Sequence, residues 1–94
     1  MKDKKRTFIH SMDLYRTIGG NIRKAREETN IGQTELGRII GLGHDSIYNI
    51  EHAKTRPEYA IIRAIAEVFS LTSDDLAKES LDVSKVKLNV PVRL

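Results

Sequence analysis

The stretch QTELGRIIGLGHDSIYNIE, residues 33–51, contains two short helical patterns on either side of a turn around Gly41. Each pattern repeats its apolar residues at the three- and four-residue spacing of a helix, so each helix has one face to bury. Helices of this length are unstable by themselves, because most helical stability in proteins comes from packing. The sequence therefore predicts helices over 33–40 and 44–52 that pack against the rest of the chain.

The second of these helices carries a polar face opposite its apolar one. Ile47, Ile50 and Glu51 fall on the inward side. The outward side carries His44, Asp45, Tyr48, Asn49 and His52. Such a row of hydrogen-bonding groups on a helix is suited to reading base edges in the major groove, as in helix-turn-helix proteins.

Further landmarks lie on both sides of this segment. In order they read IGGNIRKARE, GQTELGRIIGLG, HDSIYNIEHAKTRP, IIRAIAEVF and LTSDDL. With these landmarks, residues 18–76 resemble the helix-turn-helix family of phage repressors and Cro-type proteins, which is also called lambda-repressor-like or XRE. The resemblance implies a mainly α fold with five helices. It also implies a sequence-specific transcriptional regulator, most simply a repressor that binds a palindromic operator on double-stranded DNA as a homodimer.

We expect the helix-turn-helix domain to span residues 13–81. Asp13 is a suitable N-cap for a first helix, from which Leu14, Ile18 and Ile22 would point inward. The expected helices cover residues 13–29, 33–40, 44–52, 58–69 and 72–81. Residues 1–12 would form a basic N-terminal arm or a short strand.

The C-terminal segment 82–94 does not fit the helical pattern. Apolar residues alternate with polar ones or proline at Val86, Leu88, Val90, Val92 and Leu94. This period is typical of a half-buried β-strand, which Pro91 would restrict to a sheet edge. The strand would pair with the upstream segment RTFIHSM or with its copy in a second subunit, in which case it would be a dimerisation element. A disordered tail is the alternative.

Four outward residues of the second helix are predicted to contact bases: His44, Asp45, Tyr48 and Asn49. An asparagine can pair bidentately with adenine, and a carboxylate can accept a hydrogen bond from cytosine N4. For Asp45, an equally simple interpretation is that the acid only stabilises the helix N-terminus.

The resemblance implies two further sets of residues. Gln33 holds the position at which relatives have a glutamine that touches a phosphate and braces the recognition helix. Arg26 and Glu51 match positions that form a structural ion pair between the first helix and the recognition helix. The predicted contacts to the DNA backbone are Gln33, Arg38, Ser46, Lys54, Thr55 and Arg56.

The sequence also departs from the family pattern. Gly32 and Gly43 stand where Ser or Thr usually caps the two helices, and glycine caps somewhat less well. Gly37 replaces a usual alanine, and Ala53 replaces the glycine or asparagine that often closes the recognition helix.

Composition is consistent with a small binding module. The chain has 94 residues, no cysteine and a net charge of +3, with a net +4 in residues 1–29 and −3 in residues 58–81. It has no apolar run of membrane-spanning length, and its N-terminus lacks the apolar core of a signal peptide, so we expect a cytoplasmic protein without a membrane partner.

Two other functional classes are weighed against a simple regulator. An antitoxin would bind DNA and also a toxin or other protein partner through its tail. An enzyme would use His10, His44 and His52 with nearby acids as a metal or acid–base site. Since the chain has no HExxH motif, no cysteine ligands and no glycine-rich phosphate loop, we expect no enzyme, no metal and no cofactor.

Overall fold

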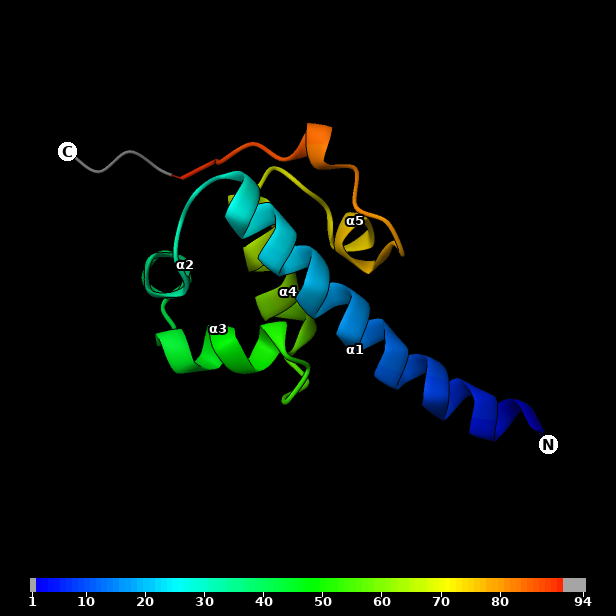
Figure 1. Cartoon of the computed structure of the whole chain (residues 1–94). Coiled ribbons are helices and arrows are strands. Elements are labelled where there is room, and N and C mark those ends of the chain that lie inside the picture. The colour runs from blue at the N-terminus through cyan, green and yellow to red at the C-terminus, as the bar shows by residue number, and fades with distance from the viewer. Residues whose placement is uncertain (1, 91–94) are drawn as a thin grey trace.

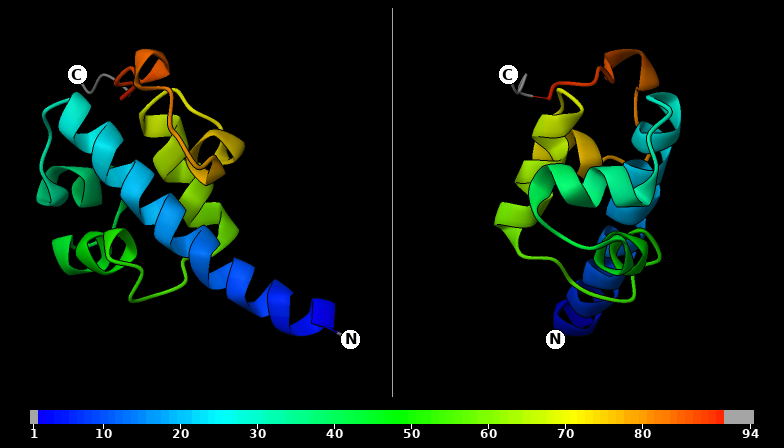
Figure 2. Two further views of the ribbon diagram at one scale, coloured as in Figure 1. Left: turned by 45° about the vertical axis from the view of Figure 1, so that its right-hand side comes forward. Right: turned by 90° about the vertical axis from the view of Figure 1, so that its left-hand side faces the viewer.

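A computed structural model describes residues 2–90 of the chain, with side chains from Asp13 onward. The elements are α1 (Lys2–Glu28), α2 (Gln33–Ile40), α3 (His44–Glu51), α4 (Tyr59–Val68), α5 (Ser73–Ala77) and a 3-10 turn, η1 (Val83–Lys85). The long α1 lies diagonally across the domain, with α2 and α3 toward one side and α4 and α5 toward the other (Figure 1 and Figure 2, left). The mainly α, five-helix fold expected from the sequence is confirmed, and α2 has the predicted bounds.

One apolar core joins the five helices. Each helix contributes at least one of the largest wholly buried side chains, and Phe69 directly follows α4. These side chains are Ile22, Leu36, Ile47, Ile65, Phe69 and Leu76. Because each short helix contributes its single apolar face to this core, none of them is stable without the others.

The first helix starts earlier than predicted. It begins at Lys2, so the expected arm or strand over residues 1–12 is wrong for residues 2–12, which contain no proline or glycine to interrupt a helix. Asp13 is therefore not an N-cap but pairs with Arg16, one helical turn later, at 3.0 Å. Leu14, predicted to point inward, is 41% exposed, because α1 extends beyond the other helices toward its N-terminus (Figure 1).

Close packing of α1 against α3 depends on one member of the Gly19–Gly20 pair. A Cβ atom on Gly19 would lie 2.5 Å from the carbonyl oxygen of Ile50 and 2.6 Å from that of Glu51, whereas one on Gly20 would meet nothing within 4 Å. Gly37 is similar to Gly19, since its Cβ would collide with the Leu42 carbonyl oxygen. Glycine at position 37, in place of the family's usual alanine, therefore allows the turn after α2 to approach the helix closely.

The fifth helix is shorter than predicted and is held from both ends. At its start, Thr72 and Asp75 form a capping box, in which each side chain accepts a hydrogen bond from the other's backbone N–H. At its end, the buried Asn21 side chain of α1 donates to the carbonyls of Leu76 and Lys78, both at 2.7 Å. The chain is extended at Lys78, so the helix ends at Ala77 and not near Leu81.

The C-terminal segment is not a strand within the described residues. After η1, the backbone N–H of Lys87 donates to the Phe69 carbonyl at 3.0 Å, and that of Asn89 donates to the Val68 carbonyl at 2.6 Å. Val86 packs against the core. The tail therefore follows the end of α4, and the helical contacts are not complete without it. The proposed strand partner RTFIHSM is helical, and the remaining tail residues, Pro91, Val92, Arg93 and Leu94, lie outside the described residues.

Asp75, whose side chain belongs to the capping box of α5, also makes a polar contact with the tail. The carboxylate of Asp75 also accepts a hydrogen bond from Lys85 at 2.9 Å. Hydrogen bonds from the Thr72 backbone and from Lys85 hold the pKa of Asp75 well below its usual range. This carboxylate therefore joins the start of α5 to η1.

Candidate nucleic-acid interface

The turn between α2 and α3 is made by glycine. Gly41 closes α2 with φ 84°, a left-handed conformation that side chains rarely adopt, and its N–H donates to the Gly37 carbonyl. Gly43 then precedes α3 in an extended conformation. Because glycine has no side chain, it makes no side-chain hydrogen bond to the start of the helix. The turn directs α3 across α2 with Ile47 and Ile50 buried.

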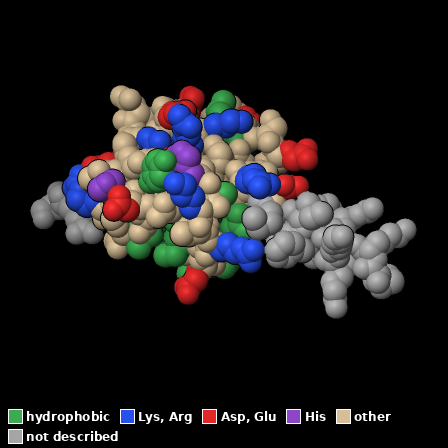
Figure 3. Space-filling view, turned by 60° about the horizontal axis from the view of Figure 1, so that its bottom comes forward, with side chains coloured by type: hydrophobic (Ala, Val, Ile, Leu, Met, Phe, Trp, Pro, Cys, Tyr) green, Lys and Arg blue, Asp and Glu red, His purple; other side chains and the backbone are tan. Residues whose placement is uncertain are grey.

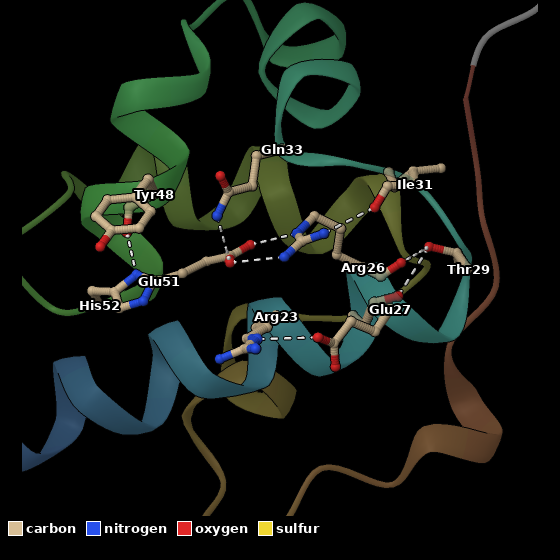
Figure 4. A network of polar contacts seen from close by, with 10 residues as sticks. Arg23, Arg26, Glu27, Thr29, Ile31, Gln33, Tyr48, Glu51 and His52 are labelled. Carbon is tan, nitrogen blue, oxygen red and sulfur yellow. Dashed lines mark hydrogen bonds and ion pairs between the residues drawn. The ribbon is translucent and has the colours of Figure 1, made fainter.

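A buried polar network fixes α3 against α1 and α2 (Figure 4). The predicted ion pair is present: Arg26 Nε lies 2.7 Å from Glu51 Oε2, and Nη2 lies 3.1 Å from Oε1. Arg26 Nη1 also donates to the Ile31 carbonyl at 3.1 Å. The Glu51 side chain is 0% exposed, and its hydrogen bond raises the pKa of Arg26. Both charges are compensated, as a buried pair requires.

Gln33 joins the same network at the start of α2. Its Nε2 donates to Glu51 Oε1 at 3.1 Å, so the brace to the recognition helix that the resemblance implied is present. An amide nitrogen carries two protons. A phosphate contact by this side chain would use the other one.

The outward face of α3 is polar and accessible. The side chains of His44 and Asp45 are 63% and 88% exposed and lie 2.9 Å apart, Nε2 to Oδ1. Tyr48 is exposed, while Asn49 and Ser46 are half-buried. The four residues that are predicted to contact bases thus lie along one side of α3.

Tyr48 belongs to a cluster that was not predicted from the sequence. Its ring stacks on His52 with centroids 4.0 Å apart, and the Lys54 ammonium lies 5.1 Å from its centroid. His52 Nδ1 lies 2.9 Å from the Tyr48 carbonyl oxygen, which can only accept, so this nitrogen donates. The one sequence signal for this cluster is the four-residue spacing of Tyr48 and His52.

The loop after α3 turns sharply at Ala53. Its φ of 56° is the left-handed conformation expected at this position, here in a residue that has a side chain. The turn is closed by hydrogen bonds from the N–H of Ala53 to the Ile50 carbonyl at 3.1 Å and from Lys54 to the Asn49 carbonyl at 2.8 Å. The side chains that follow, Lys54, Thr55 and Arg56, are exposed.

On this side of the molecule, Lys and Arg side chains gather around a central histidine, and Asp and Glu side chains lie among and around them (Figure 3). Arg38 on α2, a predicted backbone contact, is exposed and pairs with Glu35 in the same helix. A face with this balance suits a polyanionic ligand.

The part of the chain that the structure describes holds no group of three or more His, Cys, Asp or Glu side chains arranged to bind a metal ion. Between residues 2 and 90, no helix has the length and hydropathy needed to cross a membrane.

Comparison with known families agrees with this geometry. A helix-turn-helix family model (HTH_3) matches residues 22–76, more than half of the chain. The protein therefore belongs to this family, which is the lambda-repressor-like or XRE type of helix-turn-helix, and it is a DNA-binding transcriptional regulator. The family is typically non-enzymatic. No curated protein and no solved structure matches the chain significantly.

Proposed function

We propose that the protein is a sequence-specific repressor that binds a palindromic operator as a homodimer. The observation that carries this proposal is the buried network of Arg26, Glu51 and Gln33, which holds α3 while its opposite face stays polar and accessible. A reading helix fixed before binding loses little freedom when it enters the major groove. Such preorganisation favours specific readout over loose electrostatic attachment.

Each subunit would insert α3 into the major groove of one half-site. The proposed base contacts are His44, Asp45, Tyr48 and Asn49. The proposed backbone contacts are Gln33, Arg38, Ser46, Lys54, Thr55 and Arg56. In a dimer of this class, the half-sites lie about one helical turn apart, roughly 34 Å, and the bound protein occludes polymerase.

The operator should be found first, by selecting genomic fragments that the purified protein retains and reading the genes beside them. Asn49→Ala should then cost roughly 1–3 kcal/mol on the operator and little on unrelated DNA. Lys54→Ala should weaken both complexes and reduce the salt slope of binding by about one. Equal losses on the two DNAs for Asn49→Ala would remove Asn49 from the readers.

The dimer has its own test. Sedimentation of the full chain, free and with a duplex that carries one or two half-sites, reports the number of subunits. We expect two subunits on the palindromic duplex and a much weaker complex with one half-site, because linked half-sites gain effective concentration. One subunit per palindrome would contradict the dimer.

The antitoxin alternative has one supporting observation. Leu88 and Val90 of the tail are 41% and 37% exposed, so apolar side chains are available to a protein partner. A toxin encoded beside the gene should then co-purify with the wild-type chain and be lost from a Leu88→Ser, Val90→Ser variant that still binds DNA. Retention of the neighbouring product by that variant would contradict a role for these side chains.

A further inference from the structure

A hollow lies between α1 and the loop after α3. Tyr15 and Arg16 of α1 form one wall, and residues 52–56 form the other. The volume of the hollow is about 400 Å³. It adjoins the C-terminal end of α3, so a duplex that lies along the outward face of this helix continues past the hollow.

The lining of this hollow is basic. It includes the basic side chains of Arg16, Lys54 and Arg56 together with His52, and none of the acidic side chains that the structure describes lines it. Asp13 pairs with Arg16 at 3.0 Å, but both side chains are more than 60% exposed. Because an exposed pair of this kind contributes little free energy, Arg16 can exchange this partner for a stronger anion at little cost.

The walls of the hollow are held in place by the rest of the fold. Tyr15 is half-buried and packs against the core. On the other side, the loop is closed by the hydrogen bond from Lys54 N–H to Asn49, and its lysine lies over the ring of Tyr48. The basic groups therefore converge before any ligand is bound.

We propose that this hollow binds a phosphate of the DNA backbone that flanks the bases read by α3, a contact that rests on the proposed operator binding. Arg16 donates its guanidinium N–H groups, the Tyr15 hydroxyl donates a hydrogen bond, and Lys54 contributes charge. Guanidinium groups match the geometry of phosphate oxygens. Tyr15 and Arg16 precede residue 22, where the match to the family begins, so this site adds a contact from outside the family's matched region.

The chain offers a matched control for Arg16. Arg63 on α4 is also exposed, at 66% against 65%, and also pairs with an acid in its own helix, Glu67 at 3.4 Å. Arg16→Gln and Arg63→Gln thus remove the same charge and the same kind of ion pair, but only the first changes the hollow. Melting curves of both variants should coincide with that of the wild type.

Binding of the full chain to the operator and to unrelated duplex is measured across a salt series. Arg16→Gln should weaken both complexes and lower the salt slope by about one, since one phosphate is no longer neutralised, whereas Arg63→Gln should bind as the wild type does. Tyr15→Phe, which removes only the hydroxyl, should weaken both complexes less. Identical binding by Arg16→Gln, Arg63→Gln and wild type overturns the phosphate site and leaves operator binding intact. Salt-insensitive or absent binding by the wild type itself overturns the proposed function.

Two further arms identify the source of the phosphate. With duplexes shortened step by step, the difference between Arg16→Gln and wild type should disappear once the flanking phosphate is removed. A difference that persists on the shortest bound duplex would contradict a flanking contact. Inorganic phosphate titrated into the free protein should give no saturable shift in the NMR signals of residues 15–16 and 52–56. A saturable shift that Arg16→Gln abolishes would assign the hollow to a free anion and overturn the backbone assignment.

Discussion

Among the side chains that the structure describes, two polar junctions hold α1 to the rest of the domain, and they differ in the groups that they join. Toward α3, the Arg26 side chain meets the Glu51 side chain, and both are charged. Toward α5, the Asn21 side chain meets only the backbone carbonyls of Leu76 and Lys78. The first junction was predicted because Arg26 and Glu51 match positions that form an ion pair in the family that the chain resembles. The second was not predicted, because every residue has a backbone carbonyl and the sequence does not show which of them Asn21 would bind.

The two junctions also serve different purposes. The one with Arg26 and Glu51 fixes α3, whose outward face we propose to contact bases, so its loss should affect DNA binding as well as stability. The junction with Asn21 closes the end of α5, far from that face, and should affect stability alone. Breaking each of them separately tests this distinction.

The largest effect is expected at the charged junction. Arg26→Ala should lower the free energy of unfolding by roughly 3–5 kcal/mol, because it leaves Glu51 buried without its partner. The double variant Arg26→Met, Glu51→Leu should be much milder, since it buries no charge. Chemical denaturation of both variants measures the difference, and an unchanged stability in Arg26→Ala would show that the pair contributes nothing.

The neutral junction should have a smaller effect. Asn21→Leu keeps a similar volume but leaves the buried Leu76 carbonyl and the partly buried Lys78 carbonyl without their donor, at a cost of roughly 1–3 kcal/mol. Arg23→Ala, at an exposed position of the same helix, is the control and should change stability by less than about 0.5 kcal/mol. If Asn21→Leu also abolished operator binding under conditions in which it is folded, the separation of the two junctions would be wrong.

A third prediction concerns acid and the α5 side of the domain. Because the pKa of Asp75 is lowered in the folded state, its carboxylate stabilises the fold above the unfolded-state value, about 3.9, and this contribution is lost as the pH falls below it. Asp75→Asn should be less stable than wild type at neutral pH and should depend less on pH in the acid range. Asp74→Asn, outside the capping box, should keep the wild-type acid dependence. Parallel acid profiles for wild type and Asp75→Asn would contradict this role.

The smallest effect is expected in the loop after α3. Ala53 has a φ of 56°, so Ala53→Gly should relieve strain and raise the free energy of unfolding by up to about 1 kcal/mol. Ala60→Gly, within α4, should instead lower it by roughly 1 kcal/mol. Thermal melting of the two variants gives the comparison, and a loss of stability in Ala53→Gly would show that the turn is not strained.

The sequence was sufficient for the centre of the domain and insufficient at its ends. The bounds of α2, the start of α3 and the pair of Arg26 and Glu51 follow from helical periodicity and from the family pattern. The tail was predicted as a strand because alternating apolar residues are typical of one. Its N–H groups at Lys87 and Asn89 instead donate to carbonyls at the end of α4. The spacing of apolar residues indicates which side chains can be buried together. It does not indicate which backbone carbonyls remain free to accept a hydrogen bond from a later segment.

The candidate interface was predictable to a similar degree. The outward residues of α3 could be chosen from their shared face, and the brace by Gln33 from the resemblance. The hollow could not be predicted from the sequence. Tyr15 lies in a helix that was expected to begin only two residues earlier, and the other wall of the hollow comes almost forty residues later in the chain. Nothing local to either segment indicates that they meet.

The two adjacent glycines of α1 give this domain a sharp contrast in mutational tolerance. Any side chain at Gly19 has to push away the backbone at the end of α3, so a library at this position should return almost only glycine. At Gly20 there is open space, and most residues form helix better than glycine does. A deep mutational scan should therefore show a constrained position directly beside a permissive one, and the constrained one marks where the distance between the first helix and the reading helix is set.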